Sequence, residues 1–252
     1  MVSQAALSDE ERFLAAHISD LQRLSARSGV PRFSAFLNER EAVVAARAVK
    51  GEPEFFGGYD GAARTICGFF KDTYAEEIPH EEMFPVRAVT FLFRRCDKPA
   101  HRDFLGAMLA PGIKRELLGD ILVAEDYAVV FCHETAEDLI YHVDKVGRVG
   151  VKAERGVTKP LPEVKTKKID ASVSSLRLDC IVSAAANVSR ERSAALIKAG
   201  QVNADFSPCL NVSAELSEGT IISVRGSGRY RLSEVSGETR RGRLRVVIEK
   251  FI

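Results

Sequence analysis

The sequence predicts an α+β protein with three parts: a helical N-terminal region, a mixed middle domain, and a C-terminal domain of two short helices followed by strands. Three patterns predict this arrangement: apolar residues at helical spacing near the N-terminus, alternating strand-like and helix-like runs between 86 and 153, and two short helical segments from about 176. The expected bounds are 1–82, 83–156 and 174–252, with a linker at 157–173.

The N-terminal region is expected to begin with an amphipathic helix. Ser8 is followed three residues later by Glu11, which is the pattern of a capping box, and Gly29 ends the periodic run. A second helix is expected over Ser34–Val49. The apolar positions of the first helix are Phe13, Leu14, Ile18, Leu21 and Leu24.

The middle domain is expected to follow the order βαββαβ, which is that of a ferredoxin-like, RRM-like sandwich. Such a fold hosts many functions and assigns none. Phe91 and Phe93 alternate on a strand, but the basic and glycine pattern of RNA-stacking sheets is missing around Phe131, which favours core packing. The expected strands are 86–93, 119–123, 127–132 and 149–153, and the expected helices are 101–109 and 135–143.

The linker combines prolines with lysines and has few large apolar residues, so we expect an exposed hinge. Its lysines are Lys159, Lys165, Lys167 and Lys168. From Lys165 to Ile252 the chain carries 15 Lys and Arg against 9 Asp and Glu, a charge of +6, whereas the remainder carries 21 against 26, a charge of −5. A basic C-terminal third suggests that this end binds a polyanion.

The C-terminal domain is expected to open with two short helices separated by a break at Asn187-Val188. Ser189 suits the N-cap of the second helix and Gly200 suits its C-terminal end. This arrangement brings four cations into one small volume, beside helix N–H groups that favour phosphate. These cations are Arg177, Arg190, Arg192 and Lys198.

A glycine-rich turn at 225–231 follows a strand expected over Thr220–Val224. Its glycines let a ligand approach the backbone, and its arginines pair with phosphate. We favour packing for Tyr230, with stacking on a base as the alternative. A basic hairpin return at Arg240–Arg245 and a last strand at Val246–Phe251 complete the domain.

The order and spacing of these segments resemble the S4 RNA-binding domain. The matching segments are Arg177-Leu178-Asp179, Ser189–Ser193, Leu196–Val202 and Glu218–Val224. Three positions depart from that pattern, and the first two weaken the positive charge of one turn: Asn203, Asp205 and Thr220.

Further segments along the chain resemble the YlmH family of S4-domain proteins. They include Phe56–Tyr59, His101–Ala107, Gly112–Glu116, Leu118–Val123 and Lys145–Arg148. The resemblance implies a bacterial, ribosome-associated RNA-binding protein, linked to the rescue of stalled large subunits carrying peptidyl-tRNA and to cell division. It implies rRNA or tRNA as the partner, through Arg177, Ser189, Arg190, Arg192, Ser193, Lys198, Gln201, Asn203, Arg225, Ser227, Arg229 and Arg231.

The favoured hypothesis is a cytoplasmic, monomeric adaptor without enzymatic activity, cofactor or metal. No stretch is apolar enough to suggest a membrane span or a secretory signal, and the five dispersed cysteines match no zinc or redox spacing. The alternative is an RNA-modifying enzyme of the pseudouridine synthase or methyltransferase type. No nucleophile, metal set or methyl-donor loop is recognised in the first 160 residues, which leaves Asp103 or Asp120 as an open catalytic candidate.

Overall fold

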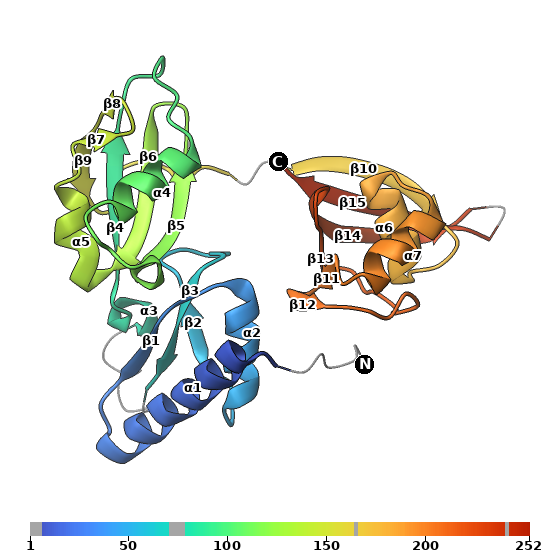
Figure 1. Ribbon diagram of the computed structural model, residues 1–252, viewed down its shortest axis with the longest axis horizontal. Coiled ribbons are helices and arrows are strands. Elements are labelled where there is room, and N and C mark those ends of the chain that lie inside the picture. Colours follow the sequence, from blue (N-terminus) through green and yellow to red (C-terminus); the bar gives the residue numbers. More distant parts are fainter. Residues whose placement is uncertain (1–6, 71–78, 164–165, 240–241) are drawn as a thin grey trace. The chain divides into compact units, whose positions relative to one another are not determined.

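The computed structural model describes residues 7–70, 79–163, 166–239 and 242–252 (Figure 1). Its contacts divide the chain into one unit at Ser8–Pro162 and another at Glu163–Ile252. Among the described residues, no helix is both long and apolar enough to cross a membrane.

The first unit opens with α1 (Asp9–Ser28), whose predicted capping box is confirmed. Ser8 Oγ accepts the backbone N–H of Glu11, and the Glu11 carboxylate accepts that of Ser8. Gly29 ends the helix with a φ of 70°. The packed side of α1 includes Ile18, which is fully buried.

The N-terminal region is not mainly helical as expected, because it also contains a three-stranded sheet of order β1-β3-β2. The predicted helix over Ser34–Val49 is a strand followed by a shorter helix that begins after Asn38. Asn38 and Glu41 form a second capping box, which fixes the start of that helix. The elements are β1 (Arg32–Leu37), α2 (Glu39–Ala48), β2 (Glu54–Phe56), β3 (Thr65–Phe69) and α3 (His80–Met83).

The middle part shows the predicted order βαββαβ, with a short additional hairpin before the last strand. Its sheet has the order β5-β6-β4-β9 with antiparallel neighbours, and α4 and α5 pack on one face (Figure 1). Phe91 and Phe93 are buried against Phe104 of α4, which confirms core packing. The elements are β4 (Val86–Leu92), α4 (His101–Leu109), β5 (Leu118–Val123), β6 (Tyr127–His133), α5 (Glu134–Tyr141), β7 (Lys145–Val146), β8 (Val149–Gly150) and β9 (Lys152–Arg155).

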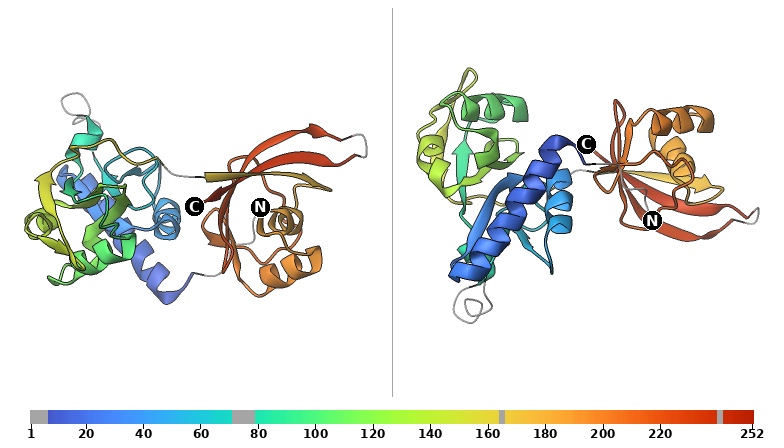
Figure 2. Two further views of the ribbon diagram at one scale, coloured as in Figure 1. Left: turned by 90° about the horizontal axis from the view of Figure 1, so that it is seen from above. Right: turned by 60° about the horizontal axis from the view of Figure 1, so that its bottom comes forward.

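The second unit is a six-stranded sheet of order β10-β15-β14-β13-β11-β12, and α6 and α7 share its hydrophobic core. Figure 2 shows the β14–β15 hairpin extending as a long arm. The two predicted helices and the break between them are confirmed, and Asn187 ends α6 with a φ of 52°. The elements are β10 (Thr166–Val173), α6 (Leu178–Ala186), α7 (Arg190–Lys198), β11 (Val202–Ala204), β12 (Ser207–Pro208), β13 (Ile221–Val224), β14 (Gly228–Glu238) and β15 (Leu244–Phe251).

The described residues of the predicted hinge make specific contacts, so they do not form the exposed spacer that was expected. Its first part packs on the middle sheet, where Thr90 Oγ1 donates to the Gly156 carbonyl and Tyr127 Oη donates to the Pro160 carbonyl. Its second part forms β10, which pairs with β15 over its full length. Lys165 of the hinge, and Arg240 and Arg241 of the expected basic hairpin return, lie outside the described residues.

Candidate nucleic-acid interface

Two of the predicted RNA-contacting arginines share one carboxylate. Asp179, in the first turn of α6, is buried and accepts hydrogen bonds from Arg190 Nη2 at 2.6 Å and from Arg177 Nε at 3.0 Å. Their side chains remain 57% and 41% exposed, so each guanidinium keeps further donors for a ligand. Asp179 therefore fixes two cations at the adjoining ends of α6 and α7.

The charge of Asp179 is maintained by these arginines. Burial raises the pKa of this carboxyl, but the hydrogen bonds from Arg190 and Arg177, with their positive charges, outweigh that effect and lower the pKa below its usual range. The same hydrogen bond raises the pKa of Arg190. At neutral pH the three groups form a permanently charged cluster with one surplus positive charge.

The structure corrects the prediction for Ser193. Its side chain is fully buried, and its hydroxyl donates to the backbone carbonyl of Asp179 at 2.9 Å. Ser193 therefore joins α7 to α6 and is not placed to contact RNA. Ser189 is exposed, and its Oγ caps α7 by accepting the N–H of Arg192 at 3.1 Å.

Arg192 and Lys198 are exposed on α7, and no ion pair of either is found within the described part of the chain. Lys198 lies in the last turn, near the carbonyl end of the helix, where a cation is favoured. Both side chains thus present positive charge that pairs with no carboxylate of the described residues.

A second group of predicted residues lies at the other end of α7. The Gln201 carbonyl, just past this helix, accepts the N–H of Arg225 at 2.9 Å and so places Gln201 beside the glycine-rich turn. Tyr230 is 1% exposed and donates to the Ser227 carbonyl at 3.1 Å. Packing is therefore confirmed for Tyr230, and its ring is not available to stack on a base.

Asn203 and Arg229 lie in one cross-strand row. Asn203 of β11 is opposite Ser223 of β13, which is opposite Arg229 of β14. The neighbours of these residues along the strands, Val202, Ala204 and Tyr230, point into the core that α6 and α7 share. Because successive side chains alternate between faces, the row is on the sheet face away from the helices. The Arg229 guanidinium lies 5.7 Å from the centroid of the Phe206 ring.

Arg231 pairs with Glu249 at 2.5 Å, so it is a weaker candidate than Arg192, for which the described residues provide no ion pair. The neighbouring turn is held by Asp205, whose φ is 44° and whose carboxylate accepts the N–H of Ile221 at 3.0 Å. The departure from the S4 pattern at this position thus has a structural role.

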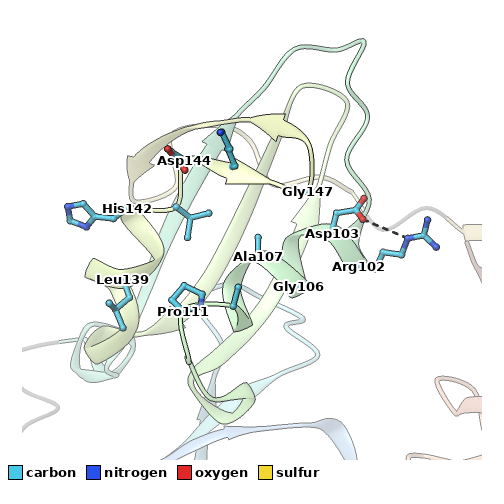
Figure 3. A pocket seen from close by; sticks show the side chains of 12 residues that line it. Arg102, Asp103, Gly106, Ala107, Pro111, Leu139, His142, Asp144 and Gly147 are labelled. Atoms are coloured by element: carbon cyan, nitrogen blue, oxygen red, sulfur yellow. Dashed lines mark ion pairs between the residues drawn. The ribbon is translucent and has the colours of Figure 1, made fainter.

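The middle part offers a shallow groove of about 820 Å³ between α4, the end of α5 and the turn after β7 (Figure 3). Arg102 and Lys145 line it together with Asp103 and Asp144, so its charges balance. Asp103 accepts the N–H of Ala100 at 2.8 Å, which caps α4. The Asp103 carboxylate, an open catalytic candidate in the sequence, is thus engaged in capping the start of α4.

Asp120, the other open catalytic candidate, is also engaged. It accepts hydrogen bonds from the Tyr59 hydroxyl at 2.8 Å and from the N–H of Ala63 at 2.7 Å. The Tyr59 ring stacks on Phe131 with centroids 5.0 Å apart, and Leu161 packs in the same cluster. These contacts cover the sheet face opposite α4 and α5, so Phe131 is not open to a base.

Sequence reasoning missed Asp179 as the anchor of the arginines. The available signal was an acidic residue directly after Arg177-Leu178, at the start of an otherwise apolar helix. No group of three or more His, Cys, Asp or Glu side chains among the described residues could hold a metal ion.

Comparisons with known proteins show the family of the chain. Residues 80–159 match the family model described as "Putative RNA-binding domain in YlmH". The chain is 32% identical over 225 residues to ribosome-associated protein quality control protein P2 of Bacillus subtilis (strain 168), covering 85% of each. The structure of cell division protein ylmH from Streptococcus pneumoniae matches with a TM-score of 0.50 and 20% identity, over 63% of this chain and 96% of that one. On this similarity, the chain belongs to the YlmH family.

Proposed function

We propose that this protein is a non-enzymatic adaptor that binds structured ribosomal or transfer RNA through an S4-type C-terminal domain. The observation that carries the proposal is the pair Arg177 and Arg190 held on Asp179, beside the exposed Arg192 of α7. Preorganised guanidinium groups bind phosphate with a smaller loss of side-chain entropy than free ones.

The family match supports a ribosomal partner. The Bacillus relative is named a ribosome-associated protein quality control protein, and the family model described as "Putative RNA-binding domain in YlmH" matches the middle part, residues 80–159. We propose that this chain acts in the cytoplasm as a monomer on large ribosomal subunits that carry peptidyl-tRNA. A link to cell division is the secondary part of the proposal and rests on the family resemblance.

The middle part contributes a ferredoxin-like domain to this proposal. The strand order β5-β6-β4-β9 and the two helices on one face support that assignment. Tyr59 and Leu161 cover the sheet face opposite α4 and α5. We therefore propose that the middle part supports RNA binding without stacking bases on that face.

The test is co-sedimentation with large ribosomal subunits over a range of salt concentrations. Arg190→Ala with Arg192→Ala should weaken binding about tenfold or more and lower the slope of log K against log salt by about 2. Arg12→Ala with Arg23→Ala is the matched control, because both side chains are exposed on α1, at 66% and 75%, outside the region matched by the RNA-binding family model. Unchanged affinity of the Arg190/Arg192 variant would refute the proposal.

A second variant keeps the test independent of folding. Arg192→Ala with Lys198→Ala removes two exposed cations and leaves the Asp179 cluster intact. It should also weaken binding. The enzymatic alternative is tested by incubating purified protein with ribosomal RNA and analysing the nucleosides, and a newly modified nucleotide would overturn the adaptor interpretation.

A further inference from the structure

Two lysines face one another at the end of the C-terminal sheet. Lys167 of β10 is directly opposite Lys250 of β15, and Lys250 is in turn opposite Tyr230 of β14. Two like charges in direct cross-strand register destabilise a sheet. This placement therefore carries a folding cost that an anionic ligand would remove.

Both lysines are on the sheet face that α6 and α7 cover. Ile169 and Ile248, each two residues away along its strand, pack in the core with these helices. Because side chains two residues apart lie on the same face of a strand, Lys167 and Lys250 continue that face beyond the core. They are thus on the helix side of the sheet, the side that carries the Asp179 cluster.

Lys250 also touches the glycine-rich turn. Its Cε lies 3.3 Å, and its Nζ 4.0 Å, from the position that a Cβ at Gly228 would occupy. Its Nζ is 5.6 Å from the centroid of the Tyr230 ring. The missing side chain at 228 therefore lets this ammonium group lie against the turn that contains Arg225, Ser227 and Arg229.

The charge of the lysines is not compensated within the described part of the chain. Glu249, the residue before Lys250 in β15, is on the opposite face of the sheet and pairs with Arg231. No ion pair of Lys167 or Lys250 is found among the described residues. The two adjacent strands lie about 4.8 Å apart, so the two ammonium groups are close enough to contact the same phosphate or neighbouring phosphates of one nucleic-acid strand.

We propose that Lys167 and Lys250 extend the RNA-binding surface from the 225–229 turn across the end of the sheet, where they contact phosphate groups. This inference rests on the proposed RNA-binding function and adds a site that the S4 pattern does not contain. The contact is with backbone phosphates, so it raises affinity for different RNA sequences alike.

The test compares Lys167→Gln with Lys250→Gln against a control of equal charge change, Arg12→Gln with Arg23→Gln. The control arginines lie outside the matched RNA-binding region, are 66% and 75% exposed, and pair with neighbouring aspartates. Binding of a fluorescent RNA hairpin is followed by anisotropy between about 50 and about 200 mM salt. The Lys167/Lys250 variant should bind several-fold more weakly, with a salt slope reduced by about 1.5, and the control should match wild type.

The outcomes separate the inference from the function on which it rests. If the Lys167/Lys250 variant binds like wild type while Arg190→Ala with Arg192→Ala weakens binding, the inference is wrong and the proposed function stands. Equal weakening by the control pair would also overturn it, because total charge would then explain the loss. Absence of RNA binding by wild type would overturn both.

Discussion

The carboxylate of Asp179 lies 2.6 Å from Nη2 of Arg190, and this contact joins the start of α6 to the start of α7. Asp179→Asn removes the charge that holds both arginines and should lower the free energy of unfolding by about 1–3 kcal/mol. Urea denaturation measures the loss. Asp170→Asn, on the exposed part of β10, is the control and should change stability by less than about 0.5 kcal/mol.

The lowered pKa of Asp179 predicts the pH dependence of this contribution. A carboxyl with a depressed folded pKa stabilises the protein fully above its unfolded pKa, about 3.9, and loses that contribution as pH falls through the folded value. The stability difference between wild type and Asp179→Asn should therefore be constant from about pH 5 to 7 and shrink below about pH 4. A difference that persists unchanged to pH 2 would contradict this assignment.

Removal of Arg190 should lower both stability and RNA affinity, whereas removal of Arg192 should lower RNA affinity alone. Arg190→Ala breaks the bond to Asp179, so it should lower both stability and RNA affinity. Arg192→Ala removes an exposed cation from α7, so it should lower affinity with stability within about 0.5 kcal/mol of wild type. Parallel thermal melts and RNA titrations of the two variants check this. Equal stability losses would show that the Asp179 contact contributes little.

The buried cysteines should be chemically inert. Burial raises the pKa of the Cys67 thiol to about 12, and burial with the charge of Glu137 does the same for Cys132. The thiolate is the reactive form, so their thiolate fraction near pH 8 falls about a thousandfold. Iodoacetamide should label exposed Cys96 first in the native protein, and Cys96→Ser should remove this fast phase. Fast labelling of Cys67 or Cys132 would contradict the burial.

How much of the fold the sequence predicts depends on where the stabilising contacts lie. Local signals sufficed for α1, where Ser8 and Glu11 cap the helix, and for the break at Asn187. A local signal was also present but missed at Asn38 and Glu41, because the apolar run before Asn38 fits a helix as well as a strand. Strand β10 has no such local signal.

β10 is lysine-rich and follows two prolines, so its sequence favours a linker. Its structure comes from pairing with β15, almost eighty residues away in the chain. The candidate site shows the same contrast between local and long-range contacts. The positions of Arg177 and Arg190 could be predicted from the S4 spacing in the sequence. The burial of Ser193 follows from α6–α7 packing, which spacing does not reveal.

Two glycines of the middle part should respond to alanine with opposite signs. A Cβ at Gly119 would lie 2.8 Å from Cε1 of Phe36 and 3.0 Å from Cβ of Phe131, so Gly119→Ala should destabilise by about 1–3 kcal/mol. Gly106 lies inside α4 with nothing within 4 Å of an added Cβ, so Gly106→Ala should stabilise by up to about 1 kcal/mol. Urea unfolding of both variants decides, and a Gly119→Ala variant as stable as wild type would show that the Phe36 ring gives way without cost.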